Sequence, residues 1–111
     1  CFPYKPYNFE EDMAYSFYEF PFQVMDRTLI DKNYMGLPPE QAIKAITRIM
    51  NEIYKFSGYF IFIWHNNTIT GFKYNKWKLV FTDIIKYGKE LNAEFLPLAL
   101  FNSRLKNENN V

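Results

Sequence analysis

The chain has 111 residues, of which 49% are hydrophobic and 21% aromatic, and its formal net charge is +1. This length predicts one domain at most, and the hydrophobic content suffices for a core and excludes wholesale disorder. The 13 basic residues are scattered rather than gathered in a stripe, which argues against nucleic acid as a partner. Because no run of about 18 apolar residues occurs, the sequence predicts no membrane span.

The first residue is also the only cysteine. A lone Cys1 excludes an internal disulfide and leaves the redox compartment open. A chain that begins with cysteine rather than methionine suggests processing or a fragment, and a processed bacterial lipoprotein is one alternative. No signal peptide is visible in the residues that follow.

The N-terminal third is predicted to be mostly irregular. Pro3 and Pro6 keep residues 1–9 extended, and residues 10–18 are expected to form a helical turn. The apolar stretch Phe20–Met25 predicts a strand, in which Pro21 is tolerated because it stands near the start. A loop is expected over residues 26–37.

A strong helix is predicted over Pro39–Phe56. Proline suits the first turn of a helix, and Glu40 places negative charge at the positive end of the helix dipole. Gly58 is expected to end the helix in the left-handed conformation. Apolar residues at helical spacing predict one buried face, formed by Ala42, Ile43, Ile46, Ile49, Met50, Ile53 and Tyr54.

The segment Tyr59–Trp64 is the clearest strand, because six apolar residues follow one another without alternation. This pattern predicts burial on both faces, as in a parallel strand covered by helices. A polar loop containing Gly71 is expected to run to about Asn75. Residues 95–101 form an apolar patch of undefined structure, and the polar residues 102–111 are expected to be a flexible tail.

A second helix is predicted over Lys76–Leu91. Gly88 falls inside this helix, where it weakens the helix and contributes no side chain. Its buried side is expected to consist of Trp77, Val80, Phe81, Ile84, Tyr87 and Leu91.

The order strand, helix, strand, helix predicts an α/β fold with two parallel strands, each followed by a helix, and a right-handed crossover. Two strands cannot close a barrel, so the chain looks incomplete as a stand-alone fold. We therefore expect a partial (β/α) barrel preceded by an irregular N-terminal segment.

Two polar residues stand where active sites occur in such folds, at the C-terminal ends of the strands. Asp26 ends the first predicted strand and His65 ends the second. If the strands are neighbours, the carboxylate favours the imidazolium form and orients the ring, which makes His65 a competent general acid. The alternative is that both are ordinary loop residues, since Asp and Asn favour turns after strands.

Other chemistries find little support in the sequence. His65 is the only histidine, so no metal ligands are predicted within this chain. No Gly-x-Ser-x-Gly motif and no glycine-rich phosphate loop occurs. Asn66-Asn67-Thr68 fits an N-glycosylation sequon, a match that is frequent by chance.

Two phrases of the sequence resemble the C-terminal portion of bacterial polysaccharide deacetylase-like proteins. These are residues 19–29, which centre on Met25-Asp26, and residues 63–66, which read Ile-Trp-His-Asn. The resemblance covers about residues 1–90. It implies a distorted (β/α) barrel that removes acetyl groups from N-acetylated sugars of a polysaccharide in bacterial cytoplasm or the cell envelope.

The same resemblance implies roles for the strand-end residues. His65 would be the general acid and Asp26 the carboxylate that tunes it. Trp64 would form an apolar wall near the acetyl methyl group, and Asn66 would contact the substrate. A divalent metal, often zinc, holds the attacking water in the family, and a further aspartate acts as base.

The family's Asp-Asp motif, metal-binding histidines and arginine motif are absent from these 111 residues. The chain is therefore expected to be the C-terminal portion of one domain, residues 1–111, whose missing N-terminal half supplies metal and base. Alone it is expected to be inactive. The alternatives are a catalytically inactive glycan-binding or interaction domain, which the aromatic content favours, and a purely structural domain.

Overall fold

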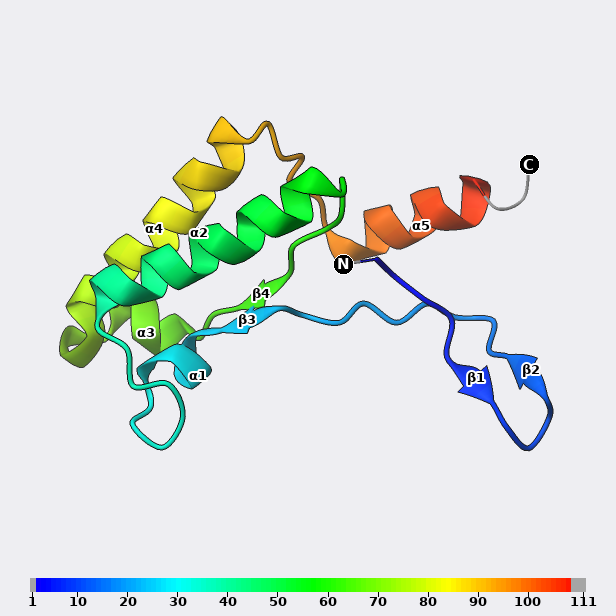
Figure 1. The fold of residues 1–111 in the computed structure, drawn as a ribbon, viewed down its shortest axis with the longest axis horizontal. Helices are drawn as coiled ribbons and strands as arrows, with labels where there is room; N and C mark the ends of the chain where they lie inside the picture. The colour runs from blue at the N-terminus through cyan, green and yellow to red at the C-terminus, as the bar shows by residue number, and fades with distance from the viewer. Residues whose placement is uncertain (1, 109–111) are drawn as a thin grey trace.

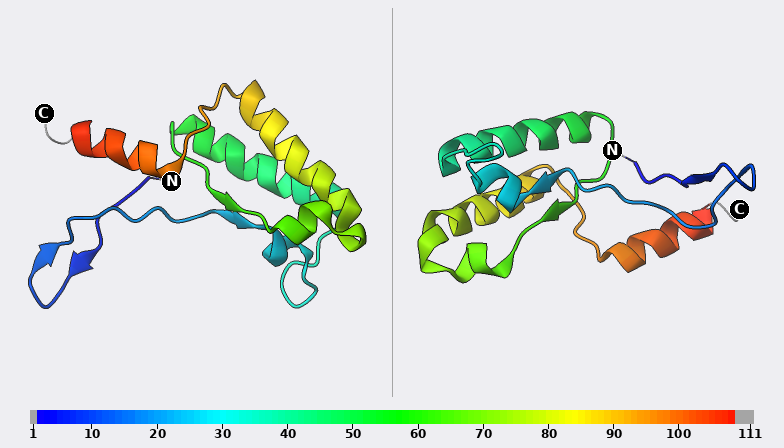
Figure 2. Two further views of the ribbon diagram at one scale, coloured as in Figure 1. Left: turned by 180° about the vertical axis from the view of Figure 1, so that it is seen from behind. Right: turned by 90° about the horizontal axis from the view of Figure 1, so that it is seen from below.

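The computed structural model describes residues 2–108 and divides them into a packed body and two extensions (Figure 1). The body comprises residues 23–91, the N-terminal arm comprises residues 2–22, and a C-terminal helix forms the second extension. The radius of gyration is 16.6 Å, whereas a compact chain of this length would have about 13 Å. The excess length lies in the extensions, which project from the body in both views of Figure 2.

The body is built on a parallel pair of strands. β3 (Val24–Met25) pairs with β4 (Phe62–Ile63), with Val24 opposite Phe62 and Met25 opposite Ile63. Helix α2 (Pro39–Lys55) connects the two strands, and α4 (Asn75–Glu90) follows β4. The predicted α/β class with a parallel pair of strands is thus confirmed. Within residues 2–108 this parallel sheet consists of β3 and β4 alone.

Both strands are shorter than the predicted spans of Phe20–Met25 and Tyr59–Trp64. Pro21 has no N–H to give to a ladder. Two residues later, the Gln23 backbone N–H still reaches the Ile61 carbonyl at 2.9 Å, but the Ile61 N–H binds the Gln23 side-chain Oε1 at 2.7 Å. A side chain thus replaces the backbone acceptor, and regular pairing begins only at Val24.

The two long helices agree closely with the predicted spans and pack against each other. Their mutual face and the strands form the core, in which Ala42, Ile46 and Ile84 have almost no exposed surface. Tyr54 was expected on the buried face but is exposed. The buried apolar residues of the core are Val24, Leu29, Ala42, Ile46, Met50, Trp77, Val80 and Ile84, with Ile53 also buried beside them.

Both long helices end on a non-glycine residue in the left-handed region. Ser57 has φ 53° after α2, and Asn92 has φ 57° after α4. In α2 the N–H of Ser57 binds the Tyr54 carbonyl and the N–H of Gly58 binds the Ile53 carbonyl, which is the Schellman pattern. The prediction that Gly58 adopts the left-handed conformation is therefore wrong, because Ser57 takes that position.

Short helices occupy the two segments that were predicted to be loops at the strand ends. α1 (Asp26–Ile30) starts immediately after β3, and α3 (Asn66–Thr70) starts one residue after Trp64-His65. A 3-10 turn, η1 (Phe72–Tyr74), then leads into α4. Gly71 ends α3, where a Cβ would lie 2.3 Å from the Asn67 carbonyl oxygen. The close approach explains a glycine at this position.

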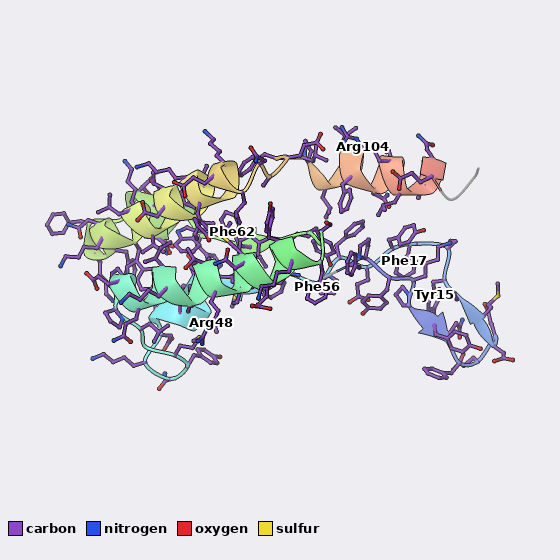
Figure 3. The ribbon with its side chains drawn as sticks, turned by 45° about the horizontal axis from the view of Figure 1, so that its top comes forward. Tyr15, Phe17, Arg48, Phe56, Phe62 and Arg104 are labelled. Atoms are coloured by element: carbon purple, nitrogen blue, oxygen red, sulfur yellow. The ribbon has the colours of Figure 1, made fainter. Side chains whose placement is uncertain are left out.

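The N-terminal arm contains a hairpin where the sequence predicts a helical turn over residues 10–18. β1 (Tyr7–Asn8) pairs antiparallel with β2 (Met13–Ala14). The Asn8 side-chain oxygen accepts the N–H groups of Glu10 and Glu11, and Asp12 has φ 52°. This local bonding favours a turn over a helix. Figure 3 shows Tyr15 and Phe17 on this arm, apart from the α2–α4 helices.

The C-terminal extension is helix α5 (Leu98–Glu108). It begins inside the apolar patch of residues 95–101 and continues through residues 102–108, where a flexible tail was expected. Residues 109–111 and Cys1 lie outside the described part of the chain. None of the helices in residues 2–108 combines the length and apolar character that a bilayer crossing needs.

One face of the β3–β4 pair is covered and the other is open. Phe60, Phe62 and Trp64 pack toward the core helices, whereas Ile63, which points to the other side of the strand, is 38% exposed. The expected burial of Tyr59–Trp64 on both faces is therefore wrong for residues 2–108. In this part of the chain, an apolar strand face remains without cover.

Candidate active site

The carboxyl ends of β3 and β4 lie at the same edge of the sheet, and each is followed at once by a short helix (Figure 1). Asp26 is the first residue of α1, and His65 is the residue that precedes α3. Because Met25 pairs with Ile63 in parallel register, Asp26 lies at the same edge of the sheet as Trp64 and His65, the two residues that follow Ile63. The geometry predicted for Asp26 and His65 is the one observed.

Asp26 and His65 are joined by two bonds. The ring Nδ1 of His65 lies 2.6 Å from Asp26 Oδ1, and the His65 backbone N–H donates to Asp26 Oδ2 at 2.9 Å. The backbone N–H of Arg27 adds a bond to Oδ1 at 2.7 Å. Asp26 itself is 0% exposed. The carboxylate is thus fixed from several sides, and it fixes the imidazole in turn.

The environment of Asp26 favours its charged form. Burial raises the pKa of the carboxyl, but hydrogen bonds from the Thr68 side chain, from His65 and from the Arg27 backbone together hold the pKa below its usual value. An ionised Asp26 accepts hydrogen bonds only, so the contact at Nδ1 requires a proton on that nitrogen. Asp26 therefore selects the His65 tautomer that leaves Nε2 free.

The exposed side of the His65 ring is where the site can exchange a proton with a bound molecule. The His65 side chain is 47% exposed although its partner carboxylate is buried. With Nδ1 bound to Asp26, Nε2 is an acceptor in the neutral ring and a donor in the imidazolium. The pair can therefore accept or deliver one proton at Nε2 on a bound molecule.

Arg27 and Tyr74 lie beside this pair. The Arg27 Nη1 donates to the Tyr74 hydroxyl at 3.3 Å, and its guanidinium carbon lies 5.6 Å from the centre of the Tyr74 ring. The bond from Arg27, together with Lys73, lowers the pKa of the Tyr74 phenol. This contact ties α1 to the start of α4, because Tyr74 directly precedes that helix.

The two predicted substrate-contacting residues lie on either side of His65 in the chain and differ in their surroundings. The Trp64 ring packs on α4, with centroid distances of 6.3 Å to Trp77 and 5.9 Å to Phe81. Its indole Nε1 is buried and has no hydrogen-bond partner in residues 2–108. Asn66 is exposed, and its side-chain oxygen accepts the Asn67 N–H at 2.8 Å.

Thr68 also lies at the site, although its position in the sequence does not predict this. This residue is completely buried, its backbone N–H donates to the His65 carbonyl at 3.1 Å, and its side chain helps to lower the pKa of the Asp26 carboxyl. The segment after His65 was expected to be a loop, in which Thr68 is part of the Asn66-Asn67-Thr68 sequon. Had a helix been assigned there, the spacing of three residues would have placed Thr68 one turn from His65, beside the strand end.

The residues of this site do not by themselves form a metal centre. Within residues 2–108, no three of the side chains of His, Cys, Asp and Glu are grouped closely enough to hold an ion. A divalent metal usually takes several such ligands. Both carboxylate oxygens of Asp26 already accept hydrogen bonds from His65 and Arg27. No chemical step is therefore assigned to a metal on these residues.

An apolar cavity of the described chain lies away from this site. An apolar groove of about 910 Å³ is lined by the C-terminal ends of α2 and α4, by residues 57–62 and by residues 91–98. Asp26 and His65 are not among its lining residues. Because residues 57–61 precede β4, this groove lies toward the strand's other end from His65.

No protein-family model matches the chain, and neither a curated protein nor a solved structure matches it. The geometry of the chain's own residues is therefore the basis for inferring its function. The likeness to polysaccharide deacetylases remains an interpretation of the sequence.

Proposed function

We propose that this chain carries the proton-donating part of a polysaccharide deacetylase-like hydrolase, a metal-dependent class that removes acetyl groups from N-acetylated glycan sugars. His65 is the general acid and Asp26 orients it. When the tetrahedral intermediate collapses, the bond from the acetyl carbon to nitrogen breaks. His65 Nε2 then gives its proton to the leaving sugar amine, and the neutral ring remains hydrogen-bonded to Asp26 through Nδ1.

One observation carries the proposal: the 2.6 Å contact between His65 Nδ1 and Asp26 Oδ1 at the carboxyl edge of two parallel strands. A buried, ionised carboxylate keeps a proton on Nδ1 and fixes the orientation of the ring. The ring then presents its second nitrogen to solvent. This is the arrangement that proton transfer to an incoming substrate needs.

The open strand face gives independent support. Ile63, which alternates with the packed Phe62 and Trp64, is exposed on the side that the core helices do not cover. In a larger (β/α) barrel this side would face the barrel interior. We propose that further strands outside these residues complete the barrel and supply both the metal ligands and the base.

The proposed substrate contacts are Trp64 and Asn66. Asn66 is exposed next to His65 and offers an amide for a sugar hydroxyl. Trp64 offers an apolar surface for the acetyl methyl group, although most of its ring packs on Trp77 and Phe81. The contribution of Trp64 is thus expected to be smaller than that of His65.

The test is acetate release from N-acetylated oligosaccharides by the complete polypeptide that contains this chain, in the presence of a divalent metal. His65→Ala is expected to lower the rate by about 100-fold or more, the usual scale for losing an acid–base group. Lys89→Ala, an exposed change on α4, is the matched control and should leave the rate unchanged. Near-normal activity of His65→Ala would refute the assignment.

A catalytically inactive glycan-binding domain is the second candidate. The observation in its favour is the exposed aromatic surface of the N-terminal arm, where Phe9 is 87% exposed and Phe2, Tyr4 and Phe17 are also exposed. Aromatic faces stack readily on sugar rings. Oligosaccharide binding by the complete polypeptide without acetate release, weakened by Phe9→Ala and unaffected by His65→Ala, would support this candidate over the first.

A further inference from the structure

Two positive charges gather around the ring of Tyr74, next to the acid–base pair. The Arg27 Nη1 donates to the Tyr74 hydroxyl at 3.3 Å, and the guanidinium carbon lies 5.6 Å from the ring centre. The Lys73 Nζ lies 5.2 Å from the centre of the same ring. Two cations held beside one side chain repel each other, which is unfavourable unless negative charge binds close to them.

The carboxylates of the described chain leave both cations without an ion-pair partner. None of the ion pairs within residues 2–108 includes Arg27 or Lys73. Asp26 precedes Arg27, but its oxygens accept hydrogen bonds from His65 and from a backbone N–H. Asp31, at the end of α1, accepts the backbone N–H two residues later at 2.9 Å. Arg27 and Lys73 therefore keep donors for a negatively charged group that does not belong to these residues.

Three different donors can converge on such a group. A guanidinium has five N–H donors in a planar fork that fits two oxygens of a carboxylate or a phosphate, and the bond from Arg27 to Tyr74 uses one of them. Lys73 is exposed and adds a point charge on a flexible stem. The Tyr74 hydroxyl accepts from Arg27, so its own proton remains for a third bond. The cluster thus has the chemistry of an anion site.

The cluster is built from the segments that follow the two strand ends of the acid–base pair. Arg27 is the residue after Asp26, and its backbone N–H donates to Asp26 Oδ1, the atom that contacts the His65 ring. Lys73 lies in η1, which packs against α3, the helix that begins after His65. The bond from Arg27 to Tyr74 joins these two segments. An anionic group bound there would belong to a molecule that also reaches His65.

An exposed aromatic ring stands beside the two cations. Phe72, the residue before Lys73, is 93% exposed. An aromatic face of this kind offers a sugar ring a surface on which to stack. An aromatic face and two cations at one turn therefore suit a sugar that carries negative charge.

We propose that Arg27, Lys73 and Tyr74 form an anion-binding subsite beside His65, which selects glycans that carry a carboxylate or phosphate group close to the N-acetylated sugar. Arg27 supplies the planar fork, Lys73 the second charge, and Phe72 a stacking surface for the sugar ring. The anion site depends only on the contacts of these residues, whereas the assignment of a glycan as its ligand rests on the proposed function.

Binding of inorganic phosphate to the 111-residue chain tests the subsite without reference to catalysis. NMR should show saturable shifts of the Arg27 Nε–H and Tyr74 ring signals. Arg27→Gln should weaken phosphate binding about tenfold or more, the scale of a hydrogen bond between charged groups, and Arg27→Lys, which keeps the charge, should weaken it less. Lys89→Gln removes an equal charge near the other end of α4 and is the control. The absence of a saturable shift, or equal weakening in Arg27→Gln and Lys89→Gln, would overturn the inference.

A second variant keeps the inference testable should Arg27→Gln not fold. Lys73 is exposed, so Lys73→Gln removes its charge without disturbing the core. This variant should weaken phosphate binding about threefold, as expected for an exposed ion pair. Unchanged phosphate affinity in Lys73→Gln would contradict a subsite that uses both cations.

Acetate release by the complete polypeptide tests which ligand the subsite serves. The substrates are N-acetylated oligosaccharides that carry a carboxylate, a phosphate ester or no charge. In Arg27→Gln, kcat/KM for a charged substrate relative to that for the neutral one should fall about tenfold, mainly through KM. The charged substrate with the larger fall identifies the bound group. An unchanged ratio for both charged substrates would refute the role in substrate selection.

Failure of the subsite and failure of the proposed function can be told apart. If phosphate binds through Arg27 but the unaltered polypeptide releases no acetate, the anion site stands and the proposed function fails. If the unaltered polypeptide releases acetate but phosphate does not bind and the substrate ratio is unchanged in Arg27→Gln, the proposed function stands and the subsite fails.

Discussion

The N-terminal arm and the α2–α4 pair are both rich in large apolar residues, yet the structure uses them in opposite ways. In the helices such residues recur at the spacing of one face, and Ala42 and Ile46 have no exposed surface. In the arm they are interrupted by Pro3, Pro6 and a hairpin, and Phe9 is 87% exposed. The comparison shows that periodicity, rather than apolar content, decides which residues build a core.

The largest expected difference between the two regions follows from replacing one large apolar side chain in each by alanine. Ile46→Ala should lower the free energy of unfolding by about 3 kcal/mol, because it leaves a cavity in the packed interface of α2 and α4. The larger deletion Phe9→Ala should change it by less than about 0.5 kcal/mol. Urea unfolding measures both. A larger loss for Phe9→Ala would show that the arm packs on the body.

The next prediction concerns how the stability of the body changes with pH, because the buried Asp26 is charged. Its pKa is lower in the folded chain than the ordinary value of 3.8, so the folded state binds the proton less tightly than the unfolded state. The stabilisation is therefore complete above pH 3.8 and is lost as the pH falls through the folded value. Asp26→Asn should lower stability by about 2 kcal/mol at pH 7.

The measurement is the urea midpoint between pH 7 and pH 2.5 for both chains. The difference between the original chain and Asp26→Asn should be constant near neutrality and shrink in acid. A difference that does not depend on pH would contradict an ionised Asp26 with a lowered pKa.

Gly71→Ala should perturb the site from a distance of several residues. A Cβ at this position would lie 2.3 Å from the Asn67 carbonyl oxygen, so the end of α3 must move. We expect a loss of about 1–2 kcal/mol and changed NMR shifts for Thr68 and His65. Gly36→Ala, also strained because of its φ of 53°, is the control and should leave those two residues unchanged.

The smallest expected effect is a gain in the free energy of unfolding. Ser57 closes α2 with φ 53°, a conformation that glycine adopts without steric cost. Ser57→Gly should therefore raise the unfolding free energy by about 0.5 kcal/mol or more. Ser103→Gly, inside α5, should not stabilise the chain, because glycine there only lowers helix propensity. A loss of stability in Ser57→Gly would contradict the observed helix end.

The sequence predicted the parts of the fold that repeat a local pattern. The helices at Pro39–Phe56 and Lys76–Leu91 follow from apolar residues at helical spacing, and their observed ends differ by only a residue. The hairpin of the arm was missed because its turn depends on Asn8 accepting two backbone N–H groups, a single-residue effect without periodicity. The open face of β4 was missed because its apolar sequence signals burial that residues 2–108 do not supply.

The candidate site was predictable in part. Asp26 and His65 could be found because each ends an apolar run, and parallel strands bring such ends together. Thr68 could not be found without the short helix α3, which has too few residues for a periodic signal. The contacts of Trp64 were also beyond reach, since the side of a strand that faces a helix depends on the register with β3.

The central claim is that the Asp26 carboxylate and the His65 ring are energetically coupled across the ends of β3 and β4. A double-mutant cycle with Asp26→Asn and His65→Gln, measured by urea unfolding at pH 6, tests it most directly. The structure predicts a coupling energy of about 1 kcal/mol or more, as for side chains in direct contact. Additive effects of the two substitutions, within about 0.3 kcal/mol, would contradict the contact and the acid–base site built on it.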